Sequence, residues 1–419
     1  MIQTLITILV LILIARLNEK FLKIPISLSL IAFSYIIAHS FPSFLHIPVE
    51  TFDETLLLLL PIILLPDVMH LKLDKLKNNA LPIFFFAFIG VAISMFLGVI
   101  FTKILLPEYA FSIGALISLF AMILATDAIT VSSVFKNFKL PEDLKIITEG
   151  ESLFNDATAL IAFYFVGLPM LIGSSVSVLG VSEKLIEVMF LSVAIGVIIG
   201  YLGYLLLKLL EDPIDEFIIM YVVSLSSFLI AEHFHVAGIL SIIFASLIFK
   251  YNIDKDLKFA EEKAEKVSQK RKSPFHYRFI KKIINNIATT KERFKENLEL
   301  SIIVAHFANG FLFISMALLV DFEALFKYWK EIIIIFILTT FLRGLNSIAG
   351  VVLFKKPISW AYIFTFAGMK GGLSIIMVHL LPDNFIYKEM FEAIVIGIVL
   401  LSMFVYSFLL IAFLKLKSV

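Results

Sequence analysis

The sequence contains no cysteine among its 419 residues, which excludes disulfide bonds and thiolate metal sites. Charged residues are also scarce, at 16% against roughly 25% in soluble domains. Hydrophobic residues make up 60% of the chain, and apolar windows of about 20 residues, long enough to cross a bilayer as a helix, recur along it. The sequence therefore predicts an all-α polytopic membrane protein embedded in a lipid bilayer.

A cleavable signal sequence is also missing. The first apolar run, residues 2–15, has no basic residue before it and is followed by Arg16, Lys20 and Lys23. A signal peptide has the opposite charge pattern and a small-residue cleavage site. We therefore expect a retained first helix with the N-terminus outside.

Hydropathy and helix breakers predict thirteen transmembrane helices. They are expected near residues 2–16, 24–40, 55–71, 80–105, 110–135, 145–171, 185–209, 217–233, 236–250, 299–320, 331–354, 359–381 and 390–414. With this topology, 28 of the 35 Lys and Arg residues fall in the inside segments and only 5 in the outside segments. Because cytoplasmic loops are enriched in Lys and Arg, this distribution favours an external N-terminus and a cytoplasmic C-terminus.

We expect one transmembrane domain, residues 1–419, interrupted by one substantial cytoplasmic loop, residues 250–298. Within this loop Phe279, Ile280 and Ile283 recur at helical spacing beside basic residues, which predicts an amphipathic helix on the anionic inner leaflet. A solvated connector is the favoured interpretation of the loop, and a regulatory surface is the alternative.

Two predicted helices carry acids at membrane depth. The block 149–156, Glu-Gly-Glu-Ser-Leu-Phe-Asn-Asp, opens one apolar helix, and Asp127 lies in the helix before it. At about 1.5 Å rise per residue, Asp127 and Asp156 both lie about 12–17 Å from the cytoplasmic surface of a core about 30 Å thick. Because an ionisable group at this depth is costly, we expect the two acids to share a functional site.

Oxygen-bearing side chains accompany the two acids. Ser152 lies one turn from Asp156 on the same helix face, and Thr126 precedes Asp127. An oxygen-only site without clustered histidine suits a hard cation, Na⁺ or K⁺. The same carboxylate can hold a proton instead, and a site that holds either ion but cannot easily move while empty exchanges one for the other. The pattern therefore predicts antiport, with hydrogen bonding between helices as the purely structural alternative.

Two basic residues also fall inside predicted helices. Arg343 needs an acidic partner, and Glu151 is the best candidate because it flanks the site without sharing the face of Asp156. Lys370 lies among three glycines within five residues, which argues against a continuous helix there. Since transporters commonly build midplane sites at broken helices, we expect the helix at 110–135 to be the corresponding broken helix of the other half.

Four features together resemble the NhaP/NHE-type sodium/proton antiporters of the cation:proton antiporter superfamily. They are Thr126-Asp127, the block 149–156, Arg343, and Gly368-Met369-Lys370-Gly371-Gly372. The resemblance implies an NhaA-like antiporter fold of thirteen helices, with inverted repeats, a crossed pair of partly unwound helices and an elevator-like movement. It also implies a homodimer in a cell membrane, the inner or plasma membrane of a prokaryote, which transports monovalent cations and protons and uses no cofactor and no nucleic acid.

Carried over residue by residue, the resemblance assigns Asp156 as the carboxylate that binds the cation and the proton. Asp127, the Thr126 backbone carbonyl and Ser152 are implied as further Na⁺ ligands. Glu151 and Arg343 are implied as a stabilising pair, which brings the implied set to six residues.

Two further positions around the site bear on the stoichiometry and on the local backbone. Asn155, directly before Asp156, resembles the electroneutral branch of the family, so one cation per proton is expected. Lys370, expected to stabilise the site, stands where the family more often has arginine. Ala128 stands where the family usually has proline, which bears on the unwinding of that helix.

The expected function is thus exchange of Na⁺ or Li⁺ for H⁺, with no enzymatic activity. Exchange of K⁺ for H⁺ is the near alternative, and a sodium-coupled symporter of related fold is a more distant one. An intramembrane aspartyl protease also needs paired acids at the midplane, but the Gly-x-Gly-Asp motif of those enzymes is absent here. A channel is disfavoured by the isolated site and the broken helices.

Overall fold

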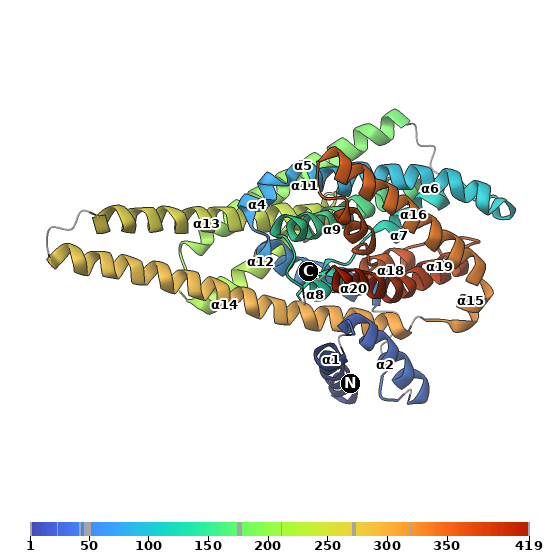
Figure 1. Ribbon diagram of the computed structural model, residues 1–419, viewed down its shortest axis with the longest axis horizontal. Helices are drawn as coiled ribbons and strands as arrows, with labels where there is room; N and C mark the ends of the chain where they lie inside the picture. Colours follow the sequence, from blue (N-terminus) through green and yellow to red (C-terminus); the bar gives the residue numbers. More distant parts are fainter. Residues whose placement is uncertain are drawn as a thin grey trace. The chain divides into compact units, whose positions relative to one another are not determined.

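The computed structural model describes residues 2–22, 24–41, 43–45, 52–136, 138–173, 178–210, 212–269, 274–318 and 320–417 (Figure 1). Within these ranges every regular element is a helix. A helix satisfies its backbone polar groups internally, as the hydrocarbon core of a bilayer requires. The prediction of an all-α architecture is confirmed.

Seven helical segments among the described residues are long and apolar enough to cross a membrane. They are 80–105, 142–171, 183–207, 213–233, 291–315, 329–353 and 388–416. Large apolar side chains stand exposed on several of them, including Phe96 at 67% and Phe190 at 72%, as lipid-facing groups do. The chain is thus a multi-pass membrane protein, whereas thirteen spans remain a prediction.

The chain divides into two compact units. Unit 1 comprises residues 1–59, 74–187 and 307–419, and unit 2 comprises residues 60–73 and 188–306. Four helices contribute residues to both: α3 (Phe52–His70), α4 (Leu73–Asn78), α11 (Val178–Leu207) and α14 (Pro274–Leu318).

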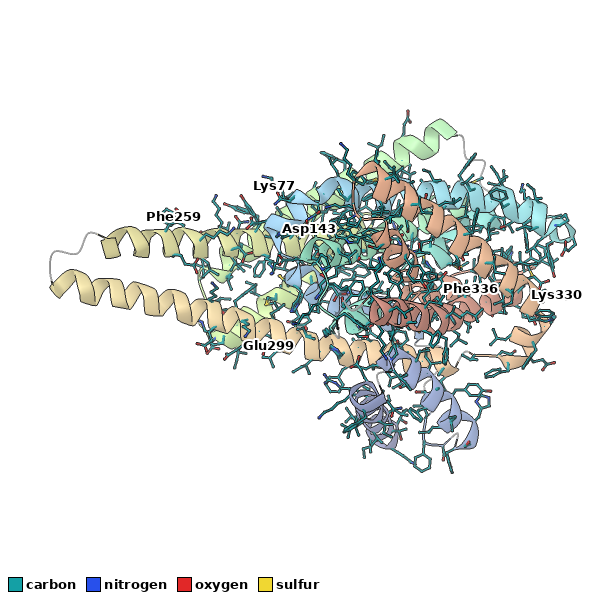
Figure 2. The ribbon with its side chains drawn as sticks, in the orientation of Figure 1. Lys77, Asp143, Phe259, Glu299, Lys330 and Phe336 are labelled. Carbon is teal, nitrogen blue, oxygen red and sulfur yellow. The ribbon has the colours of Figure 1, made fainter. Side chains whose placement is uncertain are left out.

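Unit 1 contains the acid block. The helices that lie wholly within it are α1 (Ile2–Leu22), α2 (Ile26–Ser40), α5 (Ala80–Phe84), η2 (Phe85–Gly90), α6 (Val91–Leu105), η3 (Pro107–Tyr109), α7 (Ile113–Leu124), α8 (Ala128–Phe135), α9 (Glu142–Ala162), η4 (Phe163–Gly167), α10 (Leu168–Leu171), α15 (Phe322–Lys327), α16 (Trp329–Leu353), α17 (Ser359–Phe366), α18 (Gly372–His379), α19 (Lys388–Leu401), η5 (Ser402–Tyr406) and α20 (Ser407–Leu416). Figure 2 shows Lys77 and Asp143 at one end of this unit and Lys330 at the other.

Two interruptions of the helical backbone lie inside unit 1. Residues 125–127 separate α7 from α8, and residues 367–371 separate α17 from α18. The amide of Asp127 donates to the carbonyl of Met369 at 2.7 Å, so the two interruptions are hydrogen-bonded to each other. Non-helical backbone at membrane depth leaves amides and carbonyls that need such partners.

A buried apolar cluster holds the helices around these interruptions. Phe135 of α8, Ile147 of α9 and Phe364 of α17 belong to it, together with Tyr406 and Leu410 from the C-terminal helices. Close packing of this kind has low compressibility, so it fixes the positions of the polar groups that the same helices carry.

Unit 2 is built from the second part of α3, most of α11, the helices α12 (Pro213–His233) and α13 (Gly238–Gln269), and the first part of α14. Gly196 of α11 lies so close to α13 that a Cβ there would lie 2.5 Å from the carbonyl oxygen of Ser241. Small residues that admit a neighbouring backbone are typical of helix packing in membranes.

The segment 250–298 differs from the loop that we expected. Helix α13 continues to Gln269 and α14 begins at Pro274, and Lys291 pairs with Glu261 at 3.1 Å between them (Figure 1). Polar side chains end the apolar stretch at residue 250 but leave the helical backbone intact, because they retain good helix propensity. The proposed amphipathic face at residues 279–287 lies outside the described side chains.

Candidate functional site

The centre of the candidate site is the interruption at residues 125–127, which lies against α9. Ser152 donates its hydroxyl hydrogen to the carbonyl of Thr126 at 3.0 Å. The amide of Thr126 donates to Oδ1 of Asp156 at 3.1 Å. Ser152 and Asp156 are one helical turn apart on the same face of α9. One of them therefore reaches the carbonyl of Thr126 and the other its amide.

Asp127 follows Thr126 directly, so the two predicted acids flank the same interrupted backbone. Its carboxylate accepts a hydrogen bond from the Thr130 hydroxyl, whose oxygen lies 3.2 Å from Oγ of Ser27. A Cβ at Gly371 would lie 2.7 Å from the Cβ of Asp127, so only glycine fits there without a shift. Asp127, which belongs to the first interruption, is therefore packed closely against the second.

Glu151 and Arg343 form a bidentate ion pair, as the sequence predicted. Nη1 and Nη2 of Arg343 lie 3.2 Å and 2.9 Å from Oε1 and Oε2 of Glu151. Nε of Arg343 donates to the carbonyl of Phe364 at 3.0 Å, and a Cβ at Gly368 would overlap the guanidinium group. The planar fork of arginine matches a carboxylate in this geometry, and the third donor anchors it to the end of α17.

Asn155 joins α9 to the end of α7. Its Nδ2 donates to the carbonyl of Leu124 at 2.8 Å and to Oγ1 of Thr126 at 3.2 Å. The side chain is fully buried, and its Oδ1 has no hydrogen-bond partner among the described atoms. The amide group of Asn155 therefore donates to a backbone carbonyl that has lost its helical partner at the interruption.

Lys370 contacts the same carbonyl from the second interruption. It is only 2% exposed, its Nζ donates to the carbonyl of Leu124 at 3.3 Å, and its amide donates to Oγ of Ser402 at 3.0 Å. The last carbonyl of α7 is thus shared by Asn155 and Lys370. The eight predicted site residues therefore belong to one connected set of contacts, which joins the two interruptions to the middle parts of α9 and α16.

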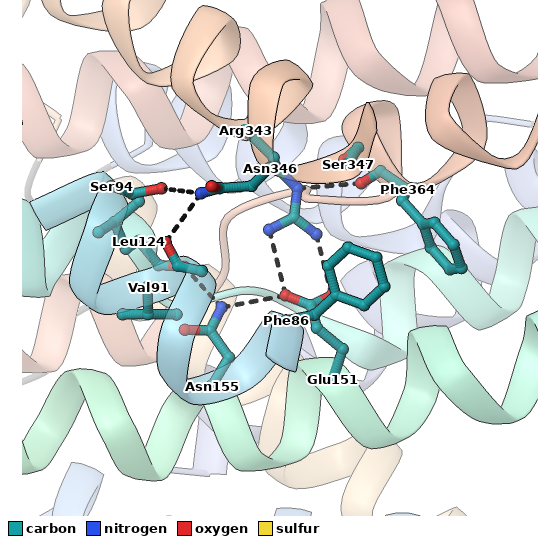
Figure 3. Close-up of a pocket in the computed structure, with 11 residues that line it drawn as sticks. Phe86, Val91, Ser94, Leu124, Glu151, Asn155, Arg343, Asn346, Ser347 and Phe364 are labelled. Carbon is teal, nitrogen blue, oxygen red and sulfur yellow. Dashed lines mark hydrogen bonds and ion pairs between the residues drawn. The ribbon is translucent and has the colours of Figure 1, made fainter. Parts of the chain in front are cut away.

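A cavity of about 30 Å³ lies beside the ion pair (Figure 3), with room for one or two water molecules. Asn346 lines it and donates to the carbonyl of Gly90 at 2.8 Å and to Oγ of Ser94 at 2.6 Å. Gly90 ends the π-helical turn η2, a type of turn that is frequent at functional sites.

Asn346 and Ser94 were not among the site residues predicted from the sequence. The spacing in the sequence could have indicated Asn346 as a site residue. It lies three residues after Arg343 and therefore on a neighbouring part of the same helix face. A second polar residue at that distance from an intramembrane arginine indicates a polar surface rather than a lone charge.

Comparison with known proteins places the whole chain in one family. Residues 6–416 match the family described as "Sodium/hydrogen exchanger, transmembrane". The Na⁺/H⁺ antiporter NhaG of Bacillus atrophaeus is 27% identical over 361 residues, which cover 85% of this chain and 62% of NhaG. The chain thus spans about three fifths of the length of that relative. The Na⁺/H⁺ antiporter ApNhaP of Aphanothece halophytica is 25% identical over 402 residues, covering 93% of this chain and 69% of ApNhaP.

The fold is similar to that of a solved structure. The sodium proton antiporter MjNhaP1 of Methanocaldococcus jannaschii, determined at pH 8, aligns over 99% of this chain and 98% of its own with a TM-score of 0.74. At 15% sequence identity, this likeness concerns the fold alone. The match over residues 6–416 identifies the chain as a member of the transmembrane sodium/hydrogen exchanger family.

Proposed function

We propose that this protein exchanges Na⁺ for H⁺ across the membrane and that the two ions compete for Asp156. One observation carries the proposal: Ser152 and Asp156 contact the peptide groups of Thr126 where α7 is interrupted. This arrangement gathers a carboxylate, a hydroxyl and a backbone carbonyl at one helix break. The names of NhaG and ApNhaP as Na⁺/H⁺ antiporters support the choice of ions.

The proposed Na⁺ ligands are the carboxylates of Asp156 and Asp127, Oγ of Ser152 and the carbonyl oxygen of Thr126. All are hard oxygen donors, the kind that alkali cations prefer. The hydrogen bond from the Thr126 amide orients Asp156 before an ion arrives. Such preorganisation reduces the conformational cost of binding.

Formal charge supports an exchange of one cation for one proton. The site holds three carboxylates, on Asp127, Glu151 and Asp156, and two cationic side chains, on Arg343 and Lys370. With all five ionised, the site carries one net negative charge, and either one Na⁺ or one proton neutralises it. Because a neutral site crosses the low-dielectric core more easily than a charged one, both loaded forms move and the empty form does not.

Movement of the site is proposed to follow the elevator-type alternating access of the family, with α7/α8 and α17/α18 as a crossed pair of interrupted helices in inverted repeats. A homodimer in the cell membrane belongs to the same proposal. Exchange of K⁺ is the second candidate because the oxygen ligands also suit that ion. The relatives named for Na⁺ favour sodium over it, and they lend no support to a sodium-coupled symporter.

The test uses purified full-length protein in liposomes that contain a pH-sensitive dye. Gradients of Na⁺, Li⁺ or K⁺ are imposed on the wild type, on Asp156→Ala and on the control Asp383→Asn, which removes an exposed carboxylate paired with Lys388. We expect Na⁺-driven proton flux that is unchanged when the membrane potential is clamped, lost in Asp156→Ala and retained in Asp383→Asn. Flux in Asp156→Ala equal to wild type, or wild-type flux with K⁺ alone, would overturn the proposal.

A further inference from the structure

A third polar side chain lies on the face of α9 that carries Ser152 and Asp156. Glu149 precedes Ser152 by three residues and Asp156 by seven, so the three side chains follow one stripe of the helix. At about 1.5 Å rise per residue, Glu149 lies about 10 Å from Asp156 along the axis. It is on the side of Asp143, the end of unit 1 that Figure 2 shows together with Lys77.

The surroundings of Glu149 differ from those of Glu151, two residues later. Glu151 is neutralised by the bidentate contact with Arg343. Glu149 is partly buried, and its hydrogen bond comes from the hydroxyl of Ser132 on α8, at 3.3 Å. No Lys or Arg within the described part of the chain forms an ion pair with it at 4.0 Å or less, and Lys145 and Lys136 are the basic groups whose charges act on it.

A partly buried carboxylate without an ion-pair partner is costly, because the surrounding protein does not replace the water that it loses. This cost is offset whenever a mobile cation occupies the position. Glu149 and Ser132 supply a carboxylate and a hydroxyl oxygen, the same donor types as Asp156 and Ser152 two turns further along. They belong to α9 and to α8, the helix that begins where the interruption at 125–127 ends.

We propose that Glu149 and Ser132 form an entry site that holds the transported monovalent cation before it reaches Asp156. The inference rests on the proposed exchange function and adds a second binding position to it. The entry site serves ions that arrive from the end of unit 1 that carries Lys75, Lys77 and Lys145, here called the lysine-rich end. It raises the cation concentration beside the face of α9 that carries Ser152 and Asp156. A cation held there then has only to move along this face to reach Asp156.

The entry site predicts an asymmetry between the two sides of the membrane. Loss of the negative charge of Glu149 lowers the local cation concentration within about 10 Å of this carboxylate, at this end of the stripe, by about tenfold at an effective dielectric constant of about 20. Glu149→Gln should therefore raise the KM for Na⁺ about tenfold when Na⁺ is supplied from the lysine-rich side. The KM from the opposite side should be unchanged, because those ions reach Asp156 without passing Glu149.

The experiment measures Na⁺-driven proton flux in everted and right-side-out membrane vesicles. Because the chain has no cysteine, Lys77→Cys with a membrane-impermeant maleimide shows which vesicles expose the lysine-rich end. The variants are Glu149→Gln, Glu149→Asp and Ser132→Ala, with Glu142→Gln as the matched control at an exposed carboxylate that pairs with Lys75. Thermal unfolding in detergent confirms that each variant is folded.

Support requires a one-sided rise in KM in Glu149→Gln, a maximal rate within about twofold of wild type, recovery in Glu149→Asp and no change in Glu142→Gln. The effect should shrink only slightly as ionic strength rises, because a partly buried charge is screened much less than an exposed one. An unchanged KM in Glu149→Gln overturns the entry site. An equal rise in KM from both sides also overturns it and assigns the effect to cation binding at Asp156. Absence of flux in wild type overturns the exchange function instead, so the two failures are distinguishable.

Discussion

The amide of Thr126 donates to Asp156 at 3.1 Å, so a carboxylate on one helix is held by the interrupted backbone of another. The hydroxyl of Ser152 closes the arrangement by donating to the carbonyl of the same threonine. Three residues thus determine both the orientation of Asp156 and the position of the carbonyl oxygen proposed to bind the cation.

The first prediction concerns Ser152→Ala. This change removes one proposed ligand and the hydrogen bond that positions another, and a loss of about 1–3 kcal/mol corresponds to roughly five- to 150-fold weaker cation binding. We expect a higher KM for Na⁺, while exchange of Na⁺ and H⁺ at Asp156 continues. Proton flux in liposomes measures both. Ser226→Ala, which removes a hydroxyl of a half-buried residue that is bonded to its own helix, is the control. A KM equal to wild type would exclude Ser152 from the ligand set.

The second prediction concerns the ion pair between Glu151 and Arg343. Their side chains are 6% and 15% exposed, so removal of one partner leaves a largely buried charge. Glu151→Gln and Arg343→Gln should each lower the free energy of unfolding by about 3–5 kcal/mol. The double variant should be more stable than the sum of the two losses predicts, which thermal unfolding in detergent measures. Strict additivity would show that the pair is not coupled.

The all-α fold class could be predicted from the apolar composition, and the contact between Glu151 and Arg343 from the need of an intramembrane charge for a partner. Arg343 needs an acidic partner, and Glu151 was predicted because it flanks the site without sharing the face of Asp156. The glycines around Lys370 marked the position where α17 ends and α18 begins. These inferences depend on local composition and on the cost of burial, and both can be read without coordinates.

The remaining features depend on tertiary contacts that no local pattern contains. The carbonyl of Leu124 accepts hydrogen bonds from both Asn155 and Lys370 because the two interruptions meet there. Leu124 and Lys370 are 246 residues apart in the sequence. The π-helical turn that ends at Gly90 has no compositional signature. The continuation of α13 past residue 250 was missed because charge was taken as the end of a helix rather than as the end of an apolar surface.

The third prediction concerns Lys250, which is 8% exposed and whose Nζ donates to the carbonyls of Met69 and Leu71 at the end of α3, the latter at 2.8 Å. Lys250→Met keeps the apolar stem and removes the donors, leaving two carbonyls without this partner. The expected loss is about 1–3 kcal/mol of unfolding free energy, seen as a lower Tm. Lys255→Met, at an exposed position of the same helix, should leave the Tm unchanged, and an equal effect of both would refute this reading.

The fourth prediction concerns Tyr109, whose hydroxyl donates to Glu331 at 2.5 Å. This hydrogen bond, burial and the charge of Glu331 raise the pKa of Tyr109 to about 12. Its ordinary pKa is about 10, so its stabilising contribution is complete below about pH 10 and is lost as the pH rises through about 12. Tyr109→Phe should lower the Tm at pH 8 and remove that part of the alkaline loss.

The control for Tyr109→Phe is Tyr201→Phe, at a side chain that is 48% exposed. Thermal unfolding between pH 8 and pH 12 compares both variants with wild type. Identical alkaline profiles for wild type and Tyr109→Phe would show that the contact with Glu331 does not contribute to stability.

The fifth prediction concerns Lys370 and the charge balance of the site. Lys370→Gln removes one of the two positive charges, so the empty site would carry two net negative charges and the site with one Na⁺ would still carry one. Moving that residual charge across the membrane potential changes its energy by about 2.3 kcal/mol per 100 mV, so exchange should become slower and sensitive to the potential. Lys370→Arg keeps the charge and should remain insensitive to it. Flux measured at clamped potentials decides the matter, because potential-insensitive exchange in Lys370→Gln would show that this lysine is not part of the charge that balances Na⁺ and H⁺.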